Sequence, residues 1–514
     1  MADRNPDLTM NPNALVKKPL IAGHQKLPMD AQNAGLDESD VPTDSIEFEQ
    51  ERQRFLTVSR QRRLLLPKAI KVGLFAGGVA VAFHLCLDFG ENIRNHLIEL
   101  ARQRGGYGMA MVIGFSVISV VVSAFLVKYF APEASGSGIP HVKAVLQGYR
   151  SFRWFRVLIV KFASGLIGIS GGLALGREGP TVQMGAAFGV GCATLPQTHQ
   201  YESRVLVAAG GGAGLAAAFN SPLAGVVFVL EELQGQIASL EFFAAAFACL
   251  TADMVCRAVL GQFPVFHISL LNAPDLSLLV AFIPLGMLTG FLGVVFNESL
   301  LAALKLGTLP THFQVAGWVA CGLALAATGW LNPDLLGGGQ TFLDKLLDTD
   351  NGIVVSSIPL FFLIRFLLTI GSYSTGAAGG IFSPILVLGA LLGLLFGKMT
   401  HLLFPHLVLE PNAFAVVGMA AYFTGVVRAP LTGIVLMIEM TGNYSLILPL
   451  FVACFSSLLI ADALNDLPIY EALLERDLQG LRGKKNRTPD GGKPVRLAPR
   501  PVKLPRNFAR DDLN

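Results

Sequence analysis

Long apolar segments recur along the middle of this chain, separated by short interruptions rich in glycine, proline and charged residues. Clear examples are residues 70–87, 109–125, 278–296, 315–331 and 446–460. Each is close to the roughly 20 residues that a helix needs to cross the hydrocarbon core of a bilayer. Other apolar segments, such as 430–440, are too short to cross it alone. The pattern predicts an all-α polytopic membrane protein built partly from short, broken helices.

Composition agrees with a membrane-embedded middle and polar ends. Hydrophobic residues make up 52% of the 514 residues and charged residues only 15%, whereas soluble domains carry about 25% charge. We expect a membrane domain over 67–475, a polar tail over 1–66 without the apolar core of a signal peptide, and a basic, disordered tail over 476–514. Basic residues beside the first and last apolar segments predict that both tails lie in the cytoplasm, because cytoplasmic flanks of membrane helices are enriched in lysine and arginine.

Several functional classes lack support in the sequence. The net charge of +3 is too small to indicate a nucleic-acid partner. No Walker A, HExxH or GxSxG pattern occurs, and the six cysteines form no CxxC pair that would suggest zinc or a disulfide framework. We therefore expect neither an enzyme nor a bound metal or cofactor.

The pentapeptide Gly-Arg-Glu-Gly-Pro at 176–180 interrupts a long apolar stretch. An ionisable carboxylate at membrane depth is costly and by default marks an ion or proton pathway, which makes Glu178 a candidate gate. Gly179 and the following proline predict a broken helix, tolerated in a membrane only where it lines a cavity or is buried in protein. The alternative is a buried acid paired with Arg177 or Lys161. We expect Arg177 to hold the break together, and Lys161 either to support an anion-attracting field or to form a salt bridge.

Two further breaks, Gly-Ser-Gly-Ile-Pro at 136–140 and Gly-Ile-Phe-Ser-Pro at 380–384, precede segments that predict helices. Free amides at a helix N-terminus, together with the helix dipole, favour an anion. Hydroxyl groups add hydrogen-bond donors without a fixed charge that would trap the ion. The predicted donors are the hydroxyls of Ser137 and Tyr444 and the backbone amides of Ile381 and Phe382, and the turn around Ser137 depends on Gly136, Gly138 and Pro140.

An internal repeat relates the two halves of the membrane domain. Residues 208–232 match residues 416–440 at an offset of 208. Glu231 recurs as Glu439, which favours a structural role such as capping a broken helix. Glu232 has Met440 as its counterpart, so we expect it to serve a directional task present in one half only. Matched residues alone leave open whether the halves are inverted or parallel.

The three breaks, in this order and followed by Tyr444, resemble the CLC family of chloride channels and chloride/proton antiporters. The similarity covers roughly residues 68–475. It implies a homodimer in which each subunit has its own pore, formed by two inverted halves at about 67–262 and 275–465. It also implies that 476–514 holds no paired CBS domains.

Position by position, the resemblance implies that Glu178 is the gating glutamate and Glu232 the intracellular proton-transfer glutamate. Ser137, Tyr444 and the amides of Ile381 and Phe382 would form the central anion site. The expected function is exchange of chloride, the substrate, for protons across a bacterial inner membrane. A passive chloride channel, gated by voltage or pH, remains the alternative, because Glu232 permits coupling without proving it.

Overall fold

The computed structural model describes residues 43–194, 200–235, 239–262, 266, 276–348, 354–406 and 410–485. The chain divides into two units, Met1–Gln61 and Arg62–Asn514. Helix α2 (Thr43–Arg102) begins in the first unit, and from Arg62 onward it belongs to the second. The last part of the expected polar tail over 1–66 is helical, from Thr43 onward. That part is rich in glutamate, glutamine, arginine and leucine, which are good helix formers despite their polarity.

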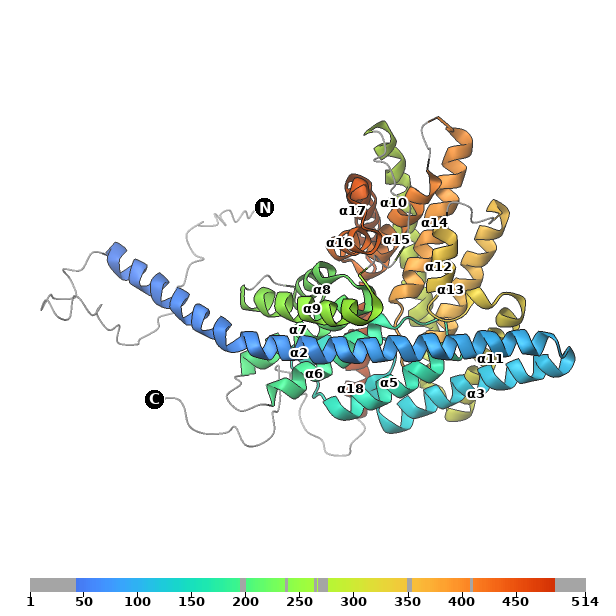
Figure 1. Ribbon diagram of the computed structural model, residues 1–514, viewed down its shortest axis with the longest axis horizontal. Coiled ribbons are helices and arrows are strands. Elements are labelled where there is room, and N and C mark those ends of the chain that lie inside the picture. Colours follow the sequence, from blue (N-terminus) through green and yellow to red (C-terminus); the bar gives the residue numbers. More distant parts are fainter. Residues whose placement is uncertain are drawn as a thin grey trace, which may run out of the picture. The chain divides into compact units, whose positions relative to one another are not determined.

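Every regular element of the described residues is helical (Figure 1). After α2, the first half contains α3 (Gly106–Phe130), α4 (Ile139–Leu146), α5 (Trp154–Ser170), α6 (Glu178–Ala193), α7 (Gln200–Phe219), α8 (Pro222–Phe228), the π-helix η2 (Val229–Gln234) and α9 (Ser239–Leu260). The second half contains α10 (Leu279–Ala303), α11 (Thr311–Leu331), α12 (Gln340–Leu347), α13 (Ile358–Ser374), α14 (Phe382–Leu403), α15 (Pro411–Val427), α16 (Pro430–Thr441) and α17 (Ile447–Ala463), and α18 (Ile469–Lys485) follows. Short 3-10 helices occur at Pro132–Ala134, Leu276–Leu278, Leu304–Thr308, Pro333–Leu335, Val355–Ser357 and Tyr444–Leu446.

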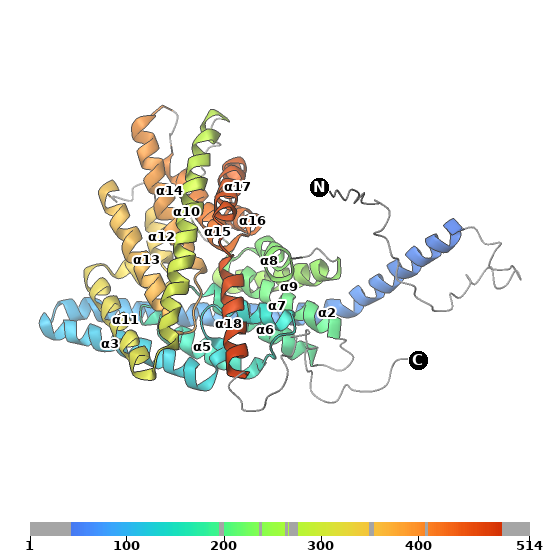
Figure 2. The ribbon, with the colours of Figure 1, turned by 180° about the vertical axis from the view of Figure 1, so that it is seen from behind.

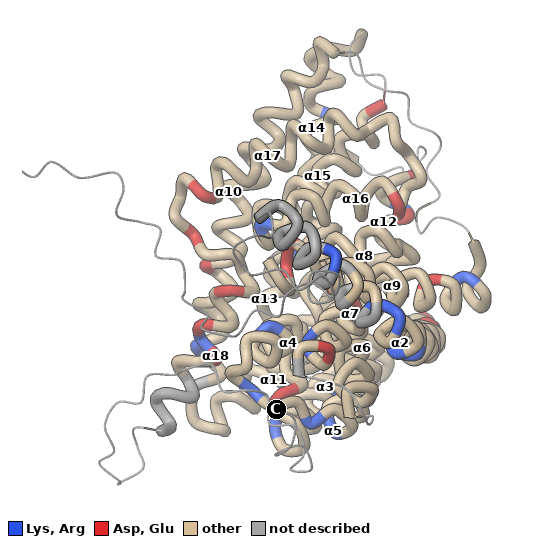
Figure 3. The backbone as a smooth tube through the Cα atoms, turned by 90° about the vertical axis from the view of Figure 1, so that its left-hand side faces the viewer, with Lys and Arg blue, Asp and Glu red and all other residues tan. Residues whose placement is uncertain are grey.

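Eight helices of the described part are long and apolar enough to cross a membrane. They cover Arg62–Arg102, Gly106–Phe130, Ser239–Leu260, Leu276–Gly307, Thr311–Leu331, Val355–Ser374, Phe382–Leu403 and Tyr444–Ala463. Charged residues are sparse along the helices of the second half, and α15 carries none (Figure 3). These features confirm the predicted all-α polytopic membrane fold with short helices between the long ones.

The internal repeat corresponds to equivalent helix contacts in the two halves. Helix α6 packs most extensively on α7, and α14 packs most extensively on α15. A Cβ added to Gly185 would lie 2.1 Å from the Gly210 carbonyl oxygen, and one added to Gly389 would lie 2.5 Å from the Gly418 carbonyl oxygen. These glycines are the matched residues of the repeat, and their lack of a side chain lets the backbones of each helix pair approach closely.

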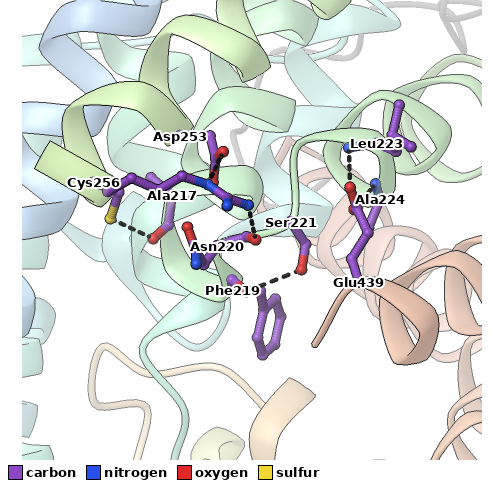
Figure 4. Close-up of polar contacts among 10 residues, drawn as sticks. Ala217, Phe219, Asn220, Ser221, Leu223, Ala224, Asp253, Cys256 and Glu439 are labelled. Carbon is purple, nitrogen blue, oxygen red and sulfur yellow. Dashed lines mark hydrogen bonds and ion pairs between the residues drawn. The ribbon is translucent and has the colours of Figure 1, made fainter. Parts of the chain in front are cut away.

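Glu231 and Glu439 cap helices of the opposite half. Glu231 accepts hydrogen bonds from the Thr432 amide and hydroxyl at the start of α16, both at 2.7 Å. Glu439, near the end of α16, accepts from the amides of Leu223 and Ala224 at the start of α8, at 3.1 and 2.8 Å (Figure 4). Each helix therefore begins where the other ends, so α8 and α16 are antiparallel. The arrangement supports the capping role expected for Glu231 and the inverted relation of the halves.

The C-terminal helix α18 extends into the expected disordered tail over 476–514, and the described part of that tail is helical. The helix continues to Lys485 and packs against α4, α10 and α15 (Figure 2). Arg476 donates a hydrogen bond to the Leu304 carbonyl at 2.5 Å, and Arg150 forms an ion pair with Asp477 at 3.3 Å. The buried side chains of α18 lie at its start, among them Ile469, Tyr470 and Leu473, and they attach the helix to the membrane domain. Residues 486–514, and residues 1–42 of the other tail, lie outside the described part.

Candidate functional site

Backbone hydrogen bonds join the three predicted helix breaks. Gly136 donates to the Ala377 carbonyl at 3.1 Å and accepts from the Gly379 amide at 3.0 Å. Gly176 and Gly380 exchange hydrogen bonds of 2.7 and 2.8 Å in an isolated antiparallel bridge. The unwound segments thus satisfy one another's polar groups, as buried non-helical backbone must within a membrane protein. Segments far apart in the sequence form one centre.

Glycine is required where these segments meet. A Cβ added to Gly179 would lie 2.8 Å from the Ser137 carbonyl oxygen and 2.9 Å from the Gly380 Cα. Gly138 has a φ of 82°, and a Cβ there would lie 2.3 Å from the Gln183 side chain. A side chain at either position would push the breaks apart. These close approaches are a physical basis for the supporting roles expected of Gly138 and Gly179.

The Glu178 carboxylate is seated at the N-terminus of α14. Its Oε1 accepts a hydrogen bond from the Ser383 hydroxyl at 2.5 Å, and its Oε2 accepts from the Ser383 amide at 3.4 Å. The Glu178 residue is 2% exposed. Amides and the dipole at a helix start stabilise negative charge. The carboxylate therefore occupies a position suited to an anion, and Ser383 is a ligand of it that sequence reasoning did not assign.

The other break residues are fully buried around this position. Ser137, Ile381 and Phe382 are each 0% exposed. The Ser137 hydroxyl accepts a hydrogen bond from the Ile139 amide at 3.3 Å, and its amide donates to the Tyr373 hydroxyl at 3.3 Å. Ile381 and Phe382 form the start of α14, immediately before Ser383. Both segments named for the anion site thus adjoin the centre that holds Glu178.

The structure does not support Tyr444 as a member of this centre. Its side chain is 70% exposed in the 3-10 helix before α17, and an anion site among buried breaks cannot use it. Tyr470, at the start of α18, is 0% exposed, and its phenolic oxygen is buried with no hydrogen-bond partner among the described residues. Sequence reasoning missed Tyr470; Pro468 before a helix start was the available signal.

The two basic residues considered as partners of Glu178, Lys161 and Arg177, bind backbone and other side chains instead. Lys161 is 0% exposed and donates to the carbonyls of Ala134 and Gly136 at 3.0 and 2.6 Å. Its salt-bridge alternative is not what the structure shows. Arg177 lies 3.5 Å from both the Ala218 carbonyl and the His84 ring nitrogen. Lys161 therefore braces the break at 136–140, whereas Arg177 contacts α7 and α2.

Glu232 lies in the π-helix η2 and forms an ion pair with Lys143 of α4. The Lys143 Nζ is 2.8 Å from Glu232 Oε1, and both side chains are 6% exposed. The same ammonium is 2.6 Å from Glu471 Oε1 on α18. Sequence reasoning singled out Glu232 but neither partner. A lysine within the short apolar segment after Pro140 was the one signal that could have indicated Lys143.

A second buried polar cluster lies beside the start of α8 (Figure 4). Arg257 donates to Asp253 at 2.6 Å and to the Asn220 carbonyl at 3.3 Å, while the Cys256 thiol donates to the Ala217 carbonyl at 3.0 Å. These contacts fasten α9 to the link between α7 and α8. Within the described residues, no group of three or more histidine, cysteine, aspartate or glutamate side chains could hold a metal ion.

Comparison with known proteins identifies the family. The family model described as voltage gated chloride channel matches residues 118–462. The chain belongs to this CLC family. The H+/Cl− exchange transporter ClcA of Vibrio parahaemolyticus is 36% identical, with 88% of this chain and 96% of that protein aligned. The protein of the same description from Vibrio cholerae is 37% identical, over 83% of this chain and 92% of that one.

Solved CLC structures resemble the whole membrane domain. A slow cyanobacterial Cl−/H+ antiporter matches with a TM-score of 0.78 and 35% identity, covering 82% of this chain and 99% of that one. A eukaryotic CLC transporter matches with a TM-score of 0.68 and 24% identity, covering 81% of this chain and 74% of that one, and shows the fold alone. The CLC fold is thus established for the domain that contains the three breaks.

Proposed function

We propose that this protein exchanges chloride for protons across a membrane, with Glu178 as the gate. The observation that carries the proposal is the Glu178 carboxylate seated on the Ser383 hydroxyl and amide at the start of α14. A negatively charged side chain occupies a position suited to a negatively charged substrate. The names of the CLC relatives, H+/Cl− exchange transporter and Cl−/H+ antiporter, support the same reaction.

The seat of Glu178 provides a way to couple the two ions. The ionised carboxylate competes with chloride for the N-terminus of α14. Protonation removes its charge and weakens its charge-assisted hydrogen bonds, so that chloride can replace it. Because occupancy by chloride and protonation of Glu178 favour each other, each ion changes the affinity for the other by the same factor.

The anion site in this proposal consists of neutral donors. Ser137, Tyr470 and the amides of Ile381 and Phe382 surround the pathway, with Tyr470 in the place first expected for Tyr444. The Tyr470 hydroxyl is buried without a protein partner among the described residues, so a bound halide would satisfy it. Neutral donors hold a desolvated anion without the tight binding that a fixed cation would produce.

Glu232 serves as the second proton site. It is buried, and its carboxylate is paired with the Lys143 ammonium at 2.8 Å. A proton taken up at Glu232 would pass to Glu178 through the region beside the anion site. We also place the ends of the membrane domain in the cytoplasm, following the basic residues that flank it. The functional form would be a multi-pass homodimer in the bilayer of a bacterial inner membrane.

Simultaneous measurement of chloride and proton flux in proteoliposomes tests the proposal. An outward chloride gradient should drive protons inward against their own gradient. Glu178→Gln should abolish proton movement and the pH dependence of chloride flux while chloride still moves. Glu232→Gln should abolish proton movement and leave chloride flux. Chloride movement without uphill proton movement in the unaltered protein would refute exchange and identify a passive channel.

A further inference from the structure

Glu471 lies on the far side of the Lys143–Glu232 ion pair. The Lys143 Nζ is 2.8 Å from Glu232 Oε1 and 2.6 Å from Glu471 Oε1. The Glu232 side chain is 6% exposed, whereas the Glu471 side chain is 43% exposed. One buried ammonium therefore bridges a buried carboxylate and a carboxylate that reaches the surface.

The three charges come from elements that also form the candidate ion pathway. Lys143 is on α4, the helix that follows the break containing Ser137. Glu471 follows Tyr470 at the start of α18. The bridge therefore ties η2, α4 and α18 together beside the anion site.

Other charged groups packed around η2 are engaged elsewhere. Glu231, on the same segment, caps α16. On α7, Arg204 is exposed and Glu202 pairs with Lys68 at 3.0 Å. On α9, Glu241 accepts from the Tyr201 hydroxyl at 3.4 Å, and Asp253 pairs with Arg257 at 2.6 Å. On α18, Asp477 pairs with Arg150 and Arg476 binds the Leu304 carbonyl. On α4, the His141 ring lies 3.1 Å from the Gln183 amide nitrogen, and on α18 Glu475 accepts from Gln479 at 3.0 Å. Lys143 thus pairs with Glu232 directly, and Glu471 reaches it through Lys143.

Protonation of Glu232 would leave the buried Lys143 ammonium without a counter-charge if Glu471 were absent. A neutral Glu232 no longer balances the Lys143 ammonium, and a buried charge without a partner is strongly unfavourable. Glu471 remains 2.6 Å away as a carboxylate and keeps the ammonium paired. Because its side chain is partly exposed, water can solvate the carboxylate charge.

We propose that Glu471 is a positioning residue for proton transfer, which keeps Lys143 paired while Glu232 is protonated and so permits Glu232 to load and release protons. The proposal rests on the proton role assigned to Glu232. It adds that the proton affinity of Glu232 is set by the competition of two carboxylates for one lysine. Lys143 favours the ionised form of Glu232, and Glu471 offsets this effect by sharing the lysine.

Charge-removing variants should shift the pH profile of proton transport in opposite directions. In Glu471→Gln, Glu232 becomes the one carboxylate partner of Lys143, so its protonation is disfavoured. We expect the profile to move to lower pH by about one unit, which lowers proton flux above the midpoint by about tenfold. In Lys143→Met, a buried carboxylate loses its cation and holds its proton more tightly. This profile should move to higher pH by about 1–3 units.

The experiment uses the full chain in proteoliposomes with a fixed chloride gradient and a series of symmetrical pH values. Initial proton and chloride rates are recorded together for each variant. Asp477→Asn is the matched control, because it removes another ion pair of α18 whose acid is similarly exposed, at 49%. It should leave the proton profile in place. Glu471→Asp keeps the negative charge and should restore the profile towards that of the unaltered protein.

A double variant separates action through Lys143 from a general effect on α18. The shift caused by Glu471→Gln should largely disappear when Lys143→Met is already present. An unshifted profile in Glu471→Gln, an equal shift in Asp477→Asn, or an undiminished shift in the double variant would each overturn the proposal. If the unaltered protein moves no protons uphill, exchange itself fails; if it does and Glu471→Gln behaves identically, only the role of Glu471 fails.

Discussion

Replacing Ser383 by alanine should remove a hydrogen bond to the Glu178 carboxylate and make the proposed gate easier to protonate. The Ser383 hydroxyl donates to Glu178 Oε1 at 2.5 Å, while the Ser383 amide, at 3.4 Å from Oε2, is a longer contact. Alanine removes the shorter bond and keeps the amide. Because a donor to a carboxylate favours its ionised form, the variant shifts Glu178 towards the protonated, released state.

The size of the effect follows from that one bond. A hydrogen bond to a charged group contributes about 1.5–3 kcal/mol, and about 1.4 kcal/mol corresponds to one pH unit. The midpoint of the pH dependence of chloride flux should therefore rise by about 1–2 units. Chloride flux in proteoliposomes, measured over a pH series, gives this midpoint directly.

Thr181→Val provides the matched control. The Thr181 hydroxyl donates to the Glu178 backbone carbonyl at 2.8 Å rather than to the carboxylate, and valine has nearly the same shape. Its midpoint should stay where it is. In a Glu178→Gln background, Ser383→Ala should have no pH dependence left to shift. An unchanged midpoint in Ser383→Ala, or an equal change in Thr181→Val, would refute the role of the hydroxyl.

Three other outcomes are expected from the contacts of the described residues. Glu231→Gln and Glu439→Gln should each lower the free energy of unfolding by about 1.5–3 kcal/mol, because each weakens a charge-assisted helix cap. The loss should appear as a lower thermal midpoint in detergent, and unchanged midpoints would contradict capping. Tyr470→Phe should weaken halide binding about tenfold in calorimetric titration, because one donor to a charged ligand is lost. Tyr444→Phe should leave halide binding unchanged, and the reverse result would restore Tyr444 to the site. Lys161→Met should lower thermal stability because two buried carbonyls lose their donor, and a stability equal to that of the unaltered protein would contradict that bracing role.

The breaks could be predicted from sequence because their signals are local. Glycine and proline beside a charged residue within an apolar stretch are unusual at any one position, and at 176–180 they indicated both the break and its acid. The repeat added a comparison between halves, which separated the capping Glu231 from Glu232. These inferences required no knowledge of which segments meet in space.

The partners of these residues could not be predicted in the same way. Ser383, Lys143 and Glu471 act through contacts between helices that lie far apart along the chain. Tyr470 was missed for a further reason, since α18 has a polar composition and its buried side chains lie at its start. A tyrosine close to a recognised motif, Tyr444, was favoured over one that tertiary packing buries.

The symmetry of the two halves limits which residues can set the direction of transport. Equivalent residues meet each other: Gly176 bonds Gly380, its counterpart at an offset of 204, and each repeated glutamate caps the equivalent helix of the other half. Contacts of this kind are the same from either side and cannot distinguish the direction of transport. Direction must therefore come from positions at which the halves differ, and the break at 176–180 supplies an acid where its counterpart supplies Phe382. Glu232, whose counterpart in the repeat is Met440, is a second position at which the halves differ. The two acids are therefore best explained as successive proton-transfer sites.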